Sequence, residues 1–297
     1  MSPRADVSLV LETSNVRPRH RIGLPDVVRA WRRQTRADRI REWIVVSGPG
    51  AAPGDRELFD GLPVRWVELP DAAYFRQKNA GFAAATCPLV ALADSDVLPA
   101  PEWLELAIEA LDGAEDRVAL VTGRSRYLPG PFVREMALAQ MPNHSPRAGG
   151  ATHFLAHNVL LRAGLVRPLG LFREEAIRLG PDTDLAERLI AAGYRLLYDP
   201  RLAATHESQR RLSGLRRTSV LTGYAFGLFE QRAGRPGPGS LRSFAGRVRV
   251  LASRLFRGRR DVGIPPWRLP LSLVFCLAYA AAFEHGRRLA LAGRPKP

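Results

Sequence analysis

The sequence predicts an α/β protein, with a mostly parallel sheet and flanking crossover helices, followed by a basic helical C-terminal region. Short apolar runs rich in Val, Ile and Leu alternate with longer stretches of helical period, which is typical of such a sheet. The chain has 297 residues, 46% of them hydrophobic, which is enough to bury a large core. Net charge is +15, and residues 207–297 carry 18 Lys or Arg against 4 Asp or Glu. We therefore expect a nearly neutral first domain over residues 1–208 and a basic region over residues 209–297.

Apolar runs predict the strands of the first half. The expected strands are Val7–Leu11, Trp43–Ser47, Val64–Leu69, Leu89–Ala93 and Ala119–Thr122. Residues 24–35 have apolar side chains three and four positions apart, as on one face of a helix. Further helices are expected within residues 75–88 and 102–111, so strands and helices alternate as a parallel sheet requires.

The second half of the first domain is less regular. Residues 124–150 are rich in Pro, Gly and Arg, and we expect a long loop over the active face there. Residues 154–164 contain a short β-like run. A helix is expected to begin near Pro181 and to end at Gly193, and the next strand is expected at Arg195–Tyr198.

The basic C-terminal region has three features. Residues 216–230 have helical character, and residues 236–239 form a Pro/Gly break. Residues 241–256 predict a basic amphipathic helix, which suits an anionic membrane interface or a solvated helix packed on the domain. Residues 269–283 carry no charge but are short for a spanning helix, so they either embed in or cross a membrane. We expect membrane association and leave its topology open.

Cysteine content and the N-terminus bear on the compartment. Cys87 and Cys276 lie far apart, which excludes a disulfide framework or a zinc site built from cysteines. The first residues lack the succession of basic, apolar and small residues that marks a secretory signal. We expect the first domain to lie on the cytoplasmic side of the cell membrane.

The most informative segment is Asp94-Ser95-Asp96, which ends the apolar run of residues 89–93. Carboxylates at the end of a buried strand emerge at the sheet edge, where open α/β sheets bind ligands. Two carboxylates one residue apart are costly to hold together unless a cation or proton shares them. Hard oxygen ligands favour Mg²⁺ or Mn²⁺, ions that keep coordination sites for phosphate groups. The alternative is that both residues only cap the turn.

Three segments, in this order, resemble the inverting family-two glycosyltransferases of the GT-A fold. They are VSLVLETSN at residues 7–15, RQKNAGFAAATCPLVALADSDVLPAPEWL at residues 76–104 and GPDTDLAERLIAAGYRLLYDPRLAATHE at residues 180–207. The resemblance spans residues 6–208. It implies a GT-A domain in which Asp94, Asp96 and His206 hold a divalent metal, Mn²⁺ or Mg²⁺, against the diphosphate of a nucleotide sugar.

The resemblance also implies roles for other residues. Those expected to bind the donor are Thr13, Asn15, Lys78, Asn79, Asp94 and Ser95. Those expected to contact the acceptor or the leaving group are His157, Asn158, Arg210 and Arg211. Asp182 matches the general base, which removes the proton of the acceptor hydroxyl during inverting transfer. Asp184 is the fallback base, and the alternative is that both acids cap a helix.

The chain departs from the family pattern at three positions. Ser47 stands where an acidic residue usually reads the base, so the sequence leaves the base of the donor open. Glu12 replaces the proline typical of the first strand's end, and Pro181 precedes Asp182 where an acid is frequent.

These observations predict a metal-dependent inverting glycosyltransferase. It is expected to move a sugar from a nucleotide donor to a membrane-linked, glycolipid or polysaccharide acceptor. The alternative is a catalytically inactive GT-A domain that serves as a membrane-bound, sugar-binding scaffold. Nucleic-acid binding through the basic region is not expected, because the sequence has no basic platform interleaved with aromatic residues.

Overall fold

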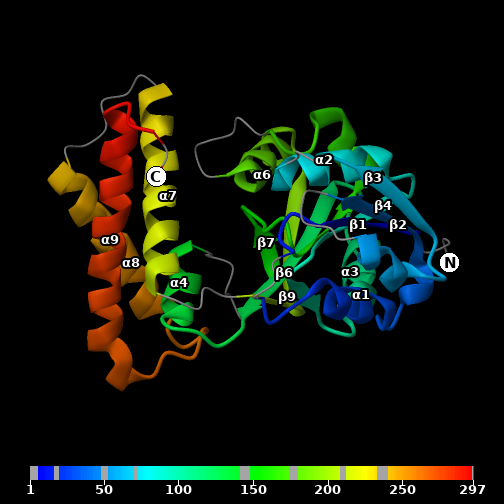
Figure 1. Ribbon diagram of the computed structural model, residues 1–297, viewed down its shortest axis with the longest axis horizontal. Helices are drawn as coiled ribbons and strands as arrows, with labels where there is room; N and C mark the ends of the chain where they lie inside the picture. The colour runs from blue at the N-terminus through cyan, green and yellow to red at the C-terminus, as the bar shows by residue number, and fades with distance from the viewer. Residues whose placement is uncertain are drawn as a thin grey trace. The chain divides into compact units, whose positions relative to one another are not determined.

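A computed structural model of the chain describes residues 6–16, 20–47, 53–69, 73–140, 148–173, 180–207, 212–232, 240–295 and 297. These residues fold into two compact units (Figure 1). The first unit holds the described residues up to 126, together with 148–173 and 181–207, and the second unit holds the rest. Residues 127–140 therefore belong to the second unit, although they fall within residues 1–208, which were expected to form the first domain.

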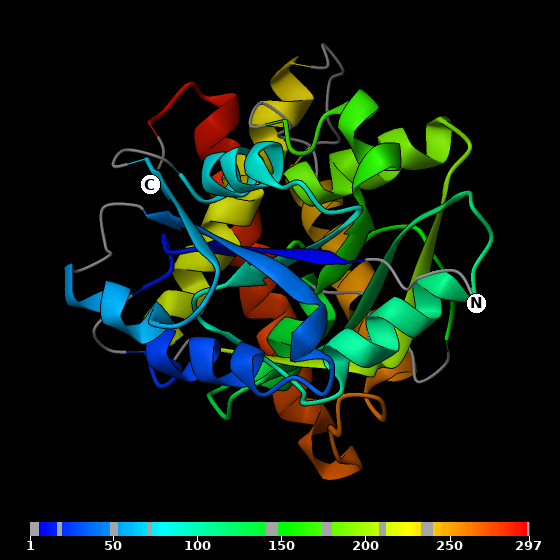
Figure 2. The same cartoon turned by 90° about the vertical axis from the view of Figure 1, so that its right-hand side faces the viewer.

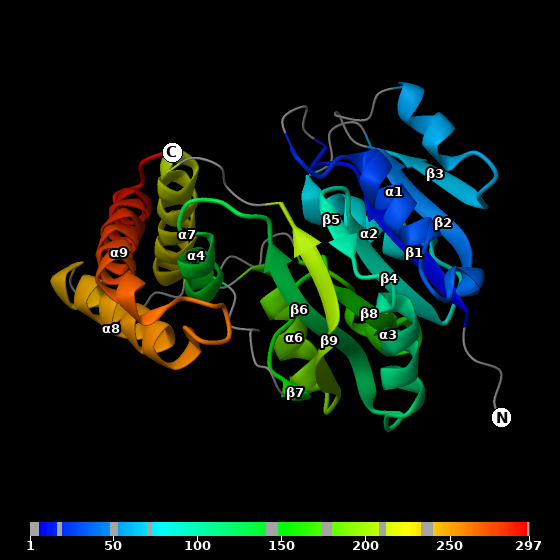
Figure 3. The ribbon, with the colours of Figure 1, turned by 90° about the horizontal axis from the view of Figure 1, so that it is seen from below.

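One mixed sheet forms the centre of the first unit. Its strands are β1 (Val7–Glu12), β2 (Ile40–Ser47), β3 (Val64–Glu68), β4 (Leu89–Asp94), β5 (Val97–Pro99), β6 (Val118–Tyr127), β7 (Gly149–Ala151), β8 (Val159–Arg162) and β9 (Arg195–His206). Their order is β3-β2-β1-β4-β8-β6-β9-β5, with β7 beside β9. Figure 3 shows β6 and β9 side by side in this sheet.

The two halves of the sheet differ in strand direction. Strands β3, β2, β1 and β4 are parallel neighbours. Strand β8 is antiparallel to both β4 and β6, and β9 is antiparallel to β5 and β7. Only the first half has the parallel arrangement that was expected for most of the sheet, because an apolar run indicates a strand without indicating its direction.

Helices cover both faces of this sheet. The helices of the first unit are α1 (Leu24–Arg32), α2 (Tyr74–Ala84), α3 (Trp103–Asp112), α5 (Ala163–Val166) and α6 (Pro181–Ala191), with short 3₁₀ turns at Ala37–Arg39, Pro53–Phe59 and Arg167–Leu169. Helices α2 and α6 lie on one side of the sheet, and α1 and α3 lie on the other (Figures 1 and 2). Trp31 of α1 and Trp103 of α3 meet edge to face, with ring centroids 5.3 Å apart.

The second unit is helical. Its helices are α4 (Val133–Gln140), α7 (Leu212–Arg232), α8 (Ser240–Gly258) and α9 (Leu269–Leu291), with a 3₁₀ turn at Pro266–Arg268. Helix α4 lies inside residues 124–150, so the expected long loop was wrong. Met136, Leu138 and Ala139 of α4 are buried in the same apolar cluster as residues of α7, α8 and α9. This helix is therefore stabilised by partners remote in sequence, which local periodicity does not reveal.

Helices α7 and α9 run in the same direction at close range. A Cβ atom added at Gly223 of α7 would lie 1.8 Å from the carbonyl oxygen of Phe283, and one at Gly286 of α9 would lie 1.9 Å from that of Val220. Small residues let the two backbones approach this closely, as they do between membrane helices. Pro266–Leu291 is long and apolar enough to cross a membrane by length and composition.

Helix α9 extends beyond the uncharged segment of residues 269–283. Glu284 and Arg287 continue the helix while buried, because Arg287 pairs with Glu284 at 3.0 Å and with Glu230 of α7 at 2.6 Å. The internal ion pairs allow charged residues to lie against α7.

Gly81 fixes the distance between α2 and the sheet. An added Cβ atom would lie 2.3 Å from Cγ1 of Val10 in β1 and 3.1 Å from Cγ2 of Val46 in β2. We therefore expect Gly81→Ala to lower the free energy of unfolding by about 1–3 kcal/mol through overpacking. The matched control is Gly164→Ala in α5, because no atom lies within 4 Å of its added Cβ. Urea denaturation of both variants tests this, and equal stability of the two would contradict it.

Candidate active site

The acidic cluster is assembled by the register of the parallel strands. Asp94 is the last residue of β4, and Glu12 is the last residue of β1 and its direct register partner. Asp96 lies in the turn that follows β4. All three side chains are buried at the carboxyl edge of the sheet.

Antiparallel pairing brings two histidines to the same edge. Val97 of β5 pairs with His206 of β9, which places that imidazole beside Asp96. Leu92 of β4 pairs with Val159 of β8, so the loop that carries His157 lies beside the end of β4. The rings of His157 and His206 meet edge to face, with centroids 4.8 Å apart.

Lys78 is the cationic partner of Asp94. Its Nζ lies 2.6 Å from Oδ1 of Asp94, and both side chains are buried. The ammonium also donates hydrogen bonds to the carbonyls of Ala93 and Ala156, at 3.3 and 3.0 Å. Burial alone would raise the pKa of Asp94, but the charge and hydrogen bond of Lys78, together with the nearby imidazoles of His157 and His206, outweigh it and the pKa is lowered. Asp94 is therefore an ionised carboxylate whose charge is compensated by Lys78.

Tyr74, at the start of α2, also holds Asp94. Its hydroxyl donates to the carboxylate of Asp94, 3.0 Å from Oδ1 and 2.9 Å from Oδ2. Burial, with the negative charge of Asp94, raises the pKa of Tyr74 well above its usual value, so the phenol stays protonated as a donor. Tyr74 was not among the residues expected at the site.

Glu12 organises the loop after β1. Its carboxylate accepts hydrogen bonds from the Ser14 amide at 2.6 Å, the Asn15 side chain at 3.1 Å and the Ser95 amide at 3.2 Å. Burial and the neighbouring charge of Asp94 raise the pKa of Glu12 to about 7. The glutamate that departs from the family pattern thus links the loop of residues 13–15 to the Asp94–Asp96 turn.

Asp96 is less completely compensated than Asp94. Its Oδ2 lies 3.7 Å from Nδ1 of His20, and its Oδ1 lies 3.9 Å from Nε2 of His206. Oδ1 is buried and accepts no hydrogen bond from the residues that the structure describes. Burial raises the pKa of Asp96 to about 6, against the lowering influence of His206. A buried acceptor of this kind is available to a cation.

Donor atoms for a metal ion converge at this edge. Asp94, His157 and His206 each offer a ligand atom, and these atoms all lie within 4.8 Å of one another. Burial lowers the pKa of His157 to about 3, so its imidazole is neutral, as a ligand must be. Its Nε2 lies 2.8 Å from Oγ of Ser125. Of the predicted metal ligands, Asp94 and His206 belong to this group, and Oδ1 of Asp96 lies 3.9 Å from Nε2 of His206. His157, expected to contact the acceptor or the leaving group, joins them.

Asp182 and Asp184 have different surroundings. Asp182 lies in the first turn of α6, and burial raises its pKa to about 6 despite the amide of Thr183, which donates to Oδ1 at 2.9 Å. Asp184 forms an ion pair with Arg188, 2.7 Å long. The same arginine donates to backbone carbonyls of residues 169–171. Asp184 therefore serves the local structure, and the fallback base is not favoured.

Two asparagines expected to touch ligands are engaged in structural contacts instead. The side chain of Asn79 donates to the Phe172 carbonyl at 2.8 Å and accepts from its amide at 2.9 Å. The side chain of Asn158 accepts from Trp103 Nε1 at 2.6 Å and donates to the Leu202 carbonyl at 3.2 Å. These paired donor and acceptor contacts hold the loops of the site in place.

The remaining expected residues lie at or near the same edge. Thr13 donates from its hydroxyl to the Val46 carbonyl at 3.0 Å, and its amide donates to Oε1 of Gln77 at 3.0 Å. Asn15 and Ser95 contact Glu12. Arg210 and Arg211 lie outside the described residues.

The sequence of this chain is similar to those of known glycosyltransferases. Residues 24–162 match the sequence profile of glycosyl transferase family 2. This part of the chain is therefore similar to the family 2 glycosyltransferases. The pre-mycofactocin glycosyltransferases of two Mycobacterium tuberculosis strains are 32% identical to it over 144 residues, which make up 46% of this chain and 30% of each relative. The match thus spans less than a third of the length of these relatives.

Two solved glycosyltransferase structures share the fold. The mannosyltransferase PcManGT of Pyrobaculum calidifontis, solved with GDP-Man and Mn²⁺, has a TM-score of 0.66 at 17% identity, covering 99% of this chain and 89% of its own. TarS 1-349 of S. aureus, solved with UDP-GlcNAc, has a TM-score of 0.55 at 13% identity, covering 98% and 93%. The predicted GT-A fold is confirmed.

Proposed function

We propose that the protein is a nucleotide-sugar-dependent, inverting glycosyltransferase. The observation that carries this proposal is the cluster of Asp94, Asp96, His157 and His206 at the carboxyl edge of the sheet, in a unit similar to the family 2 glycosyltransferases. A fold alone does not specify an activity. A set of metal ligands beside a buried carboxylate does support a specific catalytic role.

A divalent metal, Mn²⁺ or Mg²⁺, is the proposed cofactor. The residues fit such an ion, because Oδ1 of Asp96 is buried without a hydrogen-bond donor and a carboxylate and two imidazoles converge beside it. Asp96, His157 and His206 would hold the ion, and Asp94 would contribute while bound to Lys78. When bound, the ion neutralises negative charge on the diphosphate leaving group. Carboxylate and imidazole together suit Mn²⁺ better than an all-oxygen site does.

The proposed donor is a nucleoside diphosphate sugar. Its diphosphate is an anionic group that a metal ion held at this edge would neutralise. The two structural neighbours were solved with donors that carry different bases, guanine in one and uracil in the other. Because Ser47 replaces the usual acid at the end of β2, this chain offers a hydroxyl there.

Asp182 is the proposed general base. A carboxylate at the first turn of a helix, partly buried and with a pKa of about 6, is ionised at neutral pH yet basic enough to accept a proton. It would take the proton of the acceptor hydroxyl as that oxygen attacks the anomeric carbon opposite the departing diphosphate. Inversion at the anomeric carbon follows from this single displacement.

We also propose that the second unit binds the cytoplasmic face of the cell membrane and presents a lipid-linked or glycan acceptor. Helix α8 exposes Leu241, Val250 and Phe256, with exposed fractions of 79%, 43% and 57%, beside exposed Arg242 and Arg249. Apolar and cationic side chains together favour anionic lipid surfaces. We expect the protein to float with liposomes that contain anionic lipid and to remain below neutral ones at moderate salt. Equal recovery with both, or binding only to DNA, would contradict this.

Donor binding should depend on metal. We expect one of UDP-, GDP- or dTDP-sugars to raise the melting temperature in the presence of Mn²⁺, and to do so far less without it, because binding to the native state stabilises it. Asp96→Asn should lose this shift, whereas Asp184→Asn should keep it. Stabilisation equal with and without Mn²⁺ would count against the metal site. Metal-dependent binding without release of nucleoside diphosphate, in the presence of membrane extract, would favour an inactive scaffold instead.

The rate of transfer should follow the ionisation of Asp182. We expect kcat/KM to rise with pH, with a midpoint near 6, because the base acts only when deprotonated. Asp182→Asn should lower kcat by roughly 10²- to 10⁴-fold, the usual contribution of a general base. Asp184→Asn is the matched control and should keep kcat near that of the wild type. If Asp184→Asn were the more damaging change, the assignment of the base would be reversed.

A further inference from the structure

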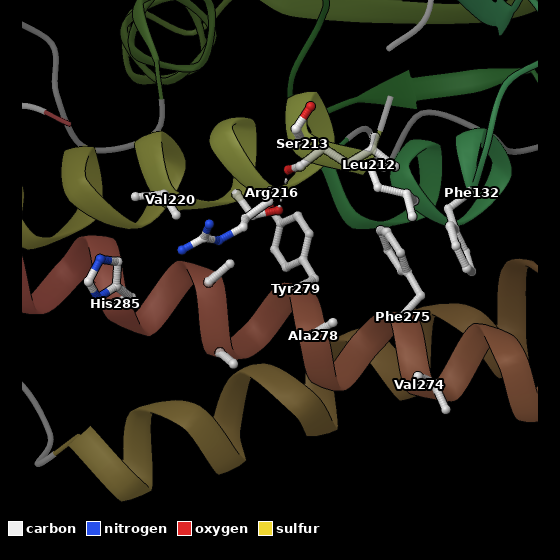
Figure 4. A pocket seen from close by; sticks show the side chains of 14 residues that line it. Phe132, Leu212, Ser213, Arg216, Val220, Val274, Phe275, Ala278, Tyr279 and His285 are labelled. Carbon is white, nitrogen blue, oxygen red and sulfur yellow. Dashed lines mark hydrogen bonds between the residues drawn. The ribbon is translucent and has the colours of Figure 1, made fainter. Parts of the chain in front are cut away.

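The second unit contains a pocket between α7 and α9 (Figure 4). Its volume is about 630 Å³, which is within the range of small-molecule sites. Helix α7 contributes residues from Leu212 to Val220, helix α9 contributes residues from Val274 to His285, and Phe132 closes one side. In Figure 4, Phe275 and Tyr279 point from α9 towards α7. None of these residues belongs to the acidic and histidine cluster of the candidate active site.

The pocket is long and largely apolar. Its lining residues on α9 recur on one face over three turns, from Val274 through Ala278 and Ala281 to His285. Helical rise makes this distance roughly 16 Å. Small alanine side chains line the middle of the pocket, and aromatic rings lie towards one end. This groove suits an extended aliphatic chain better than a compact ligand.

A cationic group lies in this otherwise apolar pocket. The guanidinium of Arg216 lies between α7 and α9 in Figure 4, near Val220. It forms no ion pair with the residues that the structure describes, and none of the described lining residues is acidic. Arginine binds phosphate groups through several donors at once. The pocket therefore complements a molecule that is aliphatic along its length and anionic at one end.

The surface beside the pocket is also apolar. Leu212 and Val274, which line it, are each 59% exposed, and Leu271 and Leu277 of α9 are 46% and 47% exposed. A ligand that leaves a membrane could therefore enter without crossing a polar surface.

We propose that this pocket binds a single-chain lipid phosphate, with the aliphatic chain between α7 and α9 and the phosphate on Arg216. The proposal rests on the proposed function, since it names the chemical class of the membrane-linked acceptor. Lipid binding by the pocket is nevertheless a property of the second unit alone.

The test is calorimetric titration of the full chain with decyl phosphate below its micellar concentration. Each of two variants in the pocket is compared with a control variant at the neighbouring residue outside it. Ala278→Trp fills the pocket, whereas Leu277→Trp places the same bulk on an exposed residue that does not line it. Arg216→Glu reverses the charge in the pocket, whereas Arg217→Glu does so one residue away, on an exposed residue outside it.

We expect saturable one-to-one binding that Ala278→Trp abolishes and Arg216→Glu weakens on the order of tenfold or more, the scale of a lost charge-assisted contact. Leu277→Trp and Arg217→Glu should bind like the wild type. Decanol and inorganic phosphate should each bind far more weakly than decyl phosphate. Equal loss in a variant and its control, equal binding of decanol, or binding only to vesicles of two-chain anionic phospholipid would overturn the proposal.

Two further measurements keep the outcomes separate. Circular dichroism identifies a variant that does not fold. If Ala278→Trp does not fold, the comparison of Arg216→Glu with Arg217→Glu tests the proposal. Thermal stabilisation by nucleotide sugar and Mn²⁺ reports on the first unit alone. If the protein is stabilised by nucleotide sugar and Mn²⁺ but does not bind decyl phosphate, the lipid site is rejected and the proposed glycosyltransferase stands. If it binds decyl phosphate but is not stabilised by nucleotide sugar and Mn²⁺, the proposed glycosyltransferase is rejected and the lipid site stands.

Discussion

Burial of like charges at one sheet edge is the constraint on which the site depends. The carboxylates of Glu12, Asp94 and Asp96 are buried together, and Lys78 compensates only Asp94 directly, at 2.6 Å. Excess negative charge in a low-dielectric environment is costly, and a protein relieves it by taking up protons or cations. Burial and the charge of Asp94 raise the pKa values of Glu12 and Asp96 to about 7 and 6, whereas the ion pair with Lys78 contributes to lowering the pKa of Asp94. A divalent metal that binds here would displace such protons.

Strand register determines which residues share this edge. Parallel pairing aligns the ends of β1 and β4, so Glu12 and Asp94 meet. The antiparallel half adds groups from the distant part of the chain, because β5 pairs with β9 and β8 pairs with β4. Lys78 and Tyr74 come from α2, which Gly81 allows to pack tightly on β1. The site thus combines the ends of β1, β4 and β9, the start of α2 and the loop before β8. Strand pairing and helix packing set their relative positions, which favours a pre-organised arrangement of charges.

The sequence predicted the parts of this site that local pattern encodes. An apolar run ending in Asp94-Ser95-Asp96 indicates a buried strand and its edge, and the expected strands at residues 7–11 and 89–93 are present. The antiparallel half was not predictable, since it depends on the pairing of remote segments. For the same reason, the proximity of His157 to Asp94 was missed, and so was the role of Glu12, although two acids at the ends of neighbouring strands could have indicated it.

Side-chain function was hardest to assign where one residue type serves two purposes. Asn79 and Asn158 fall at family motif positions, yet their amides are occupied by backbone groups and by Trp103. In the second unit, helix α4 and the length of α9 depend on tertiary packing and on the buried Arg287 ion pairs, neither of which has a local signature.

Electron paramagnetic resonance of Mn²⁺ bound to the protein with a nucleoside diphosphate tests the metal site most directly. We expect a one-to-one bound signal that is nearly lost in Asp96→Asn and kept in Asp184→Asn. The affinity for Mn²⁺ should fall as pH drops through 6, because protons compete for Asp96. Mn²⁺ binding that is unchanged in Asp96→Asn, or absent in the wild type with every nucleoside diphosphate, would contradict the claim that this acidic edge is built for a divalent cation.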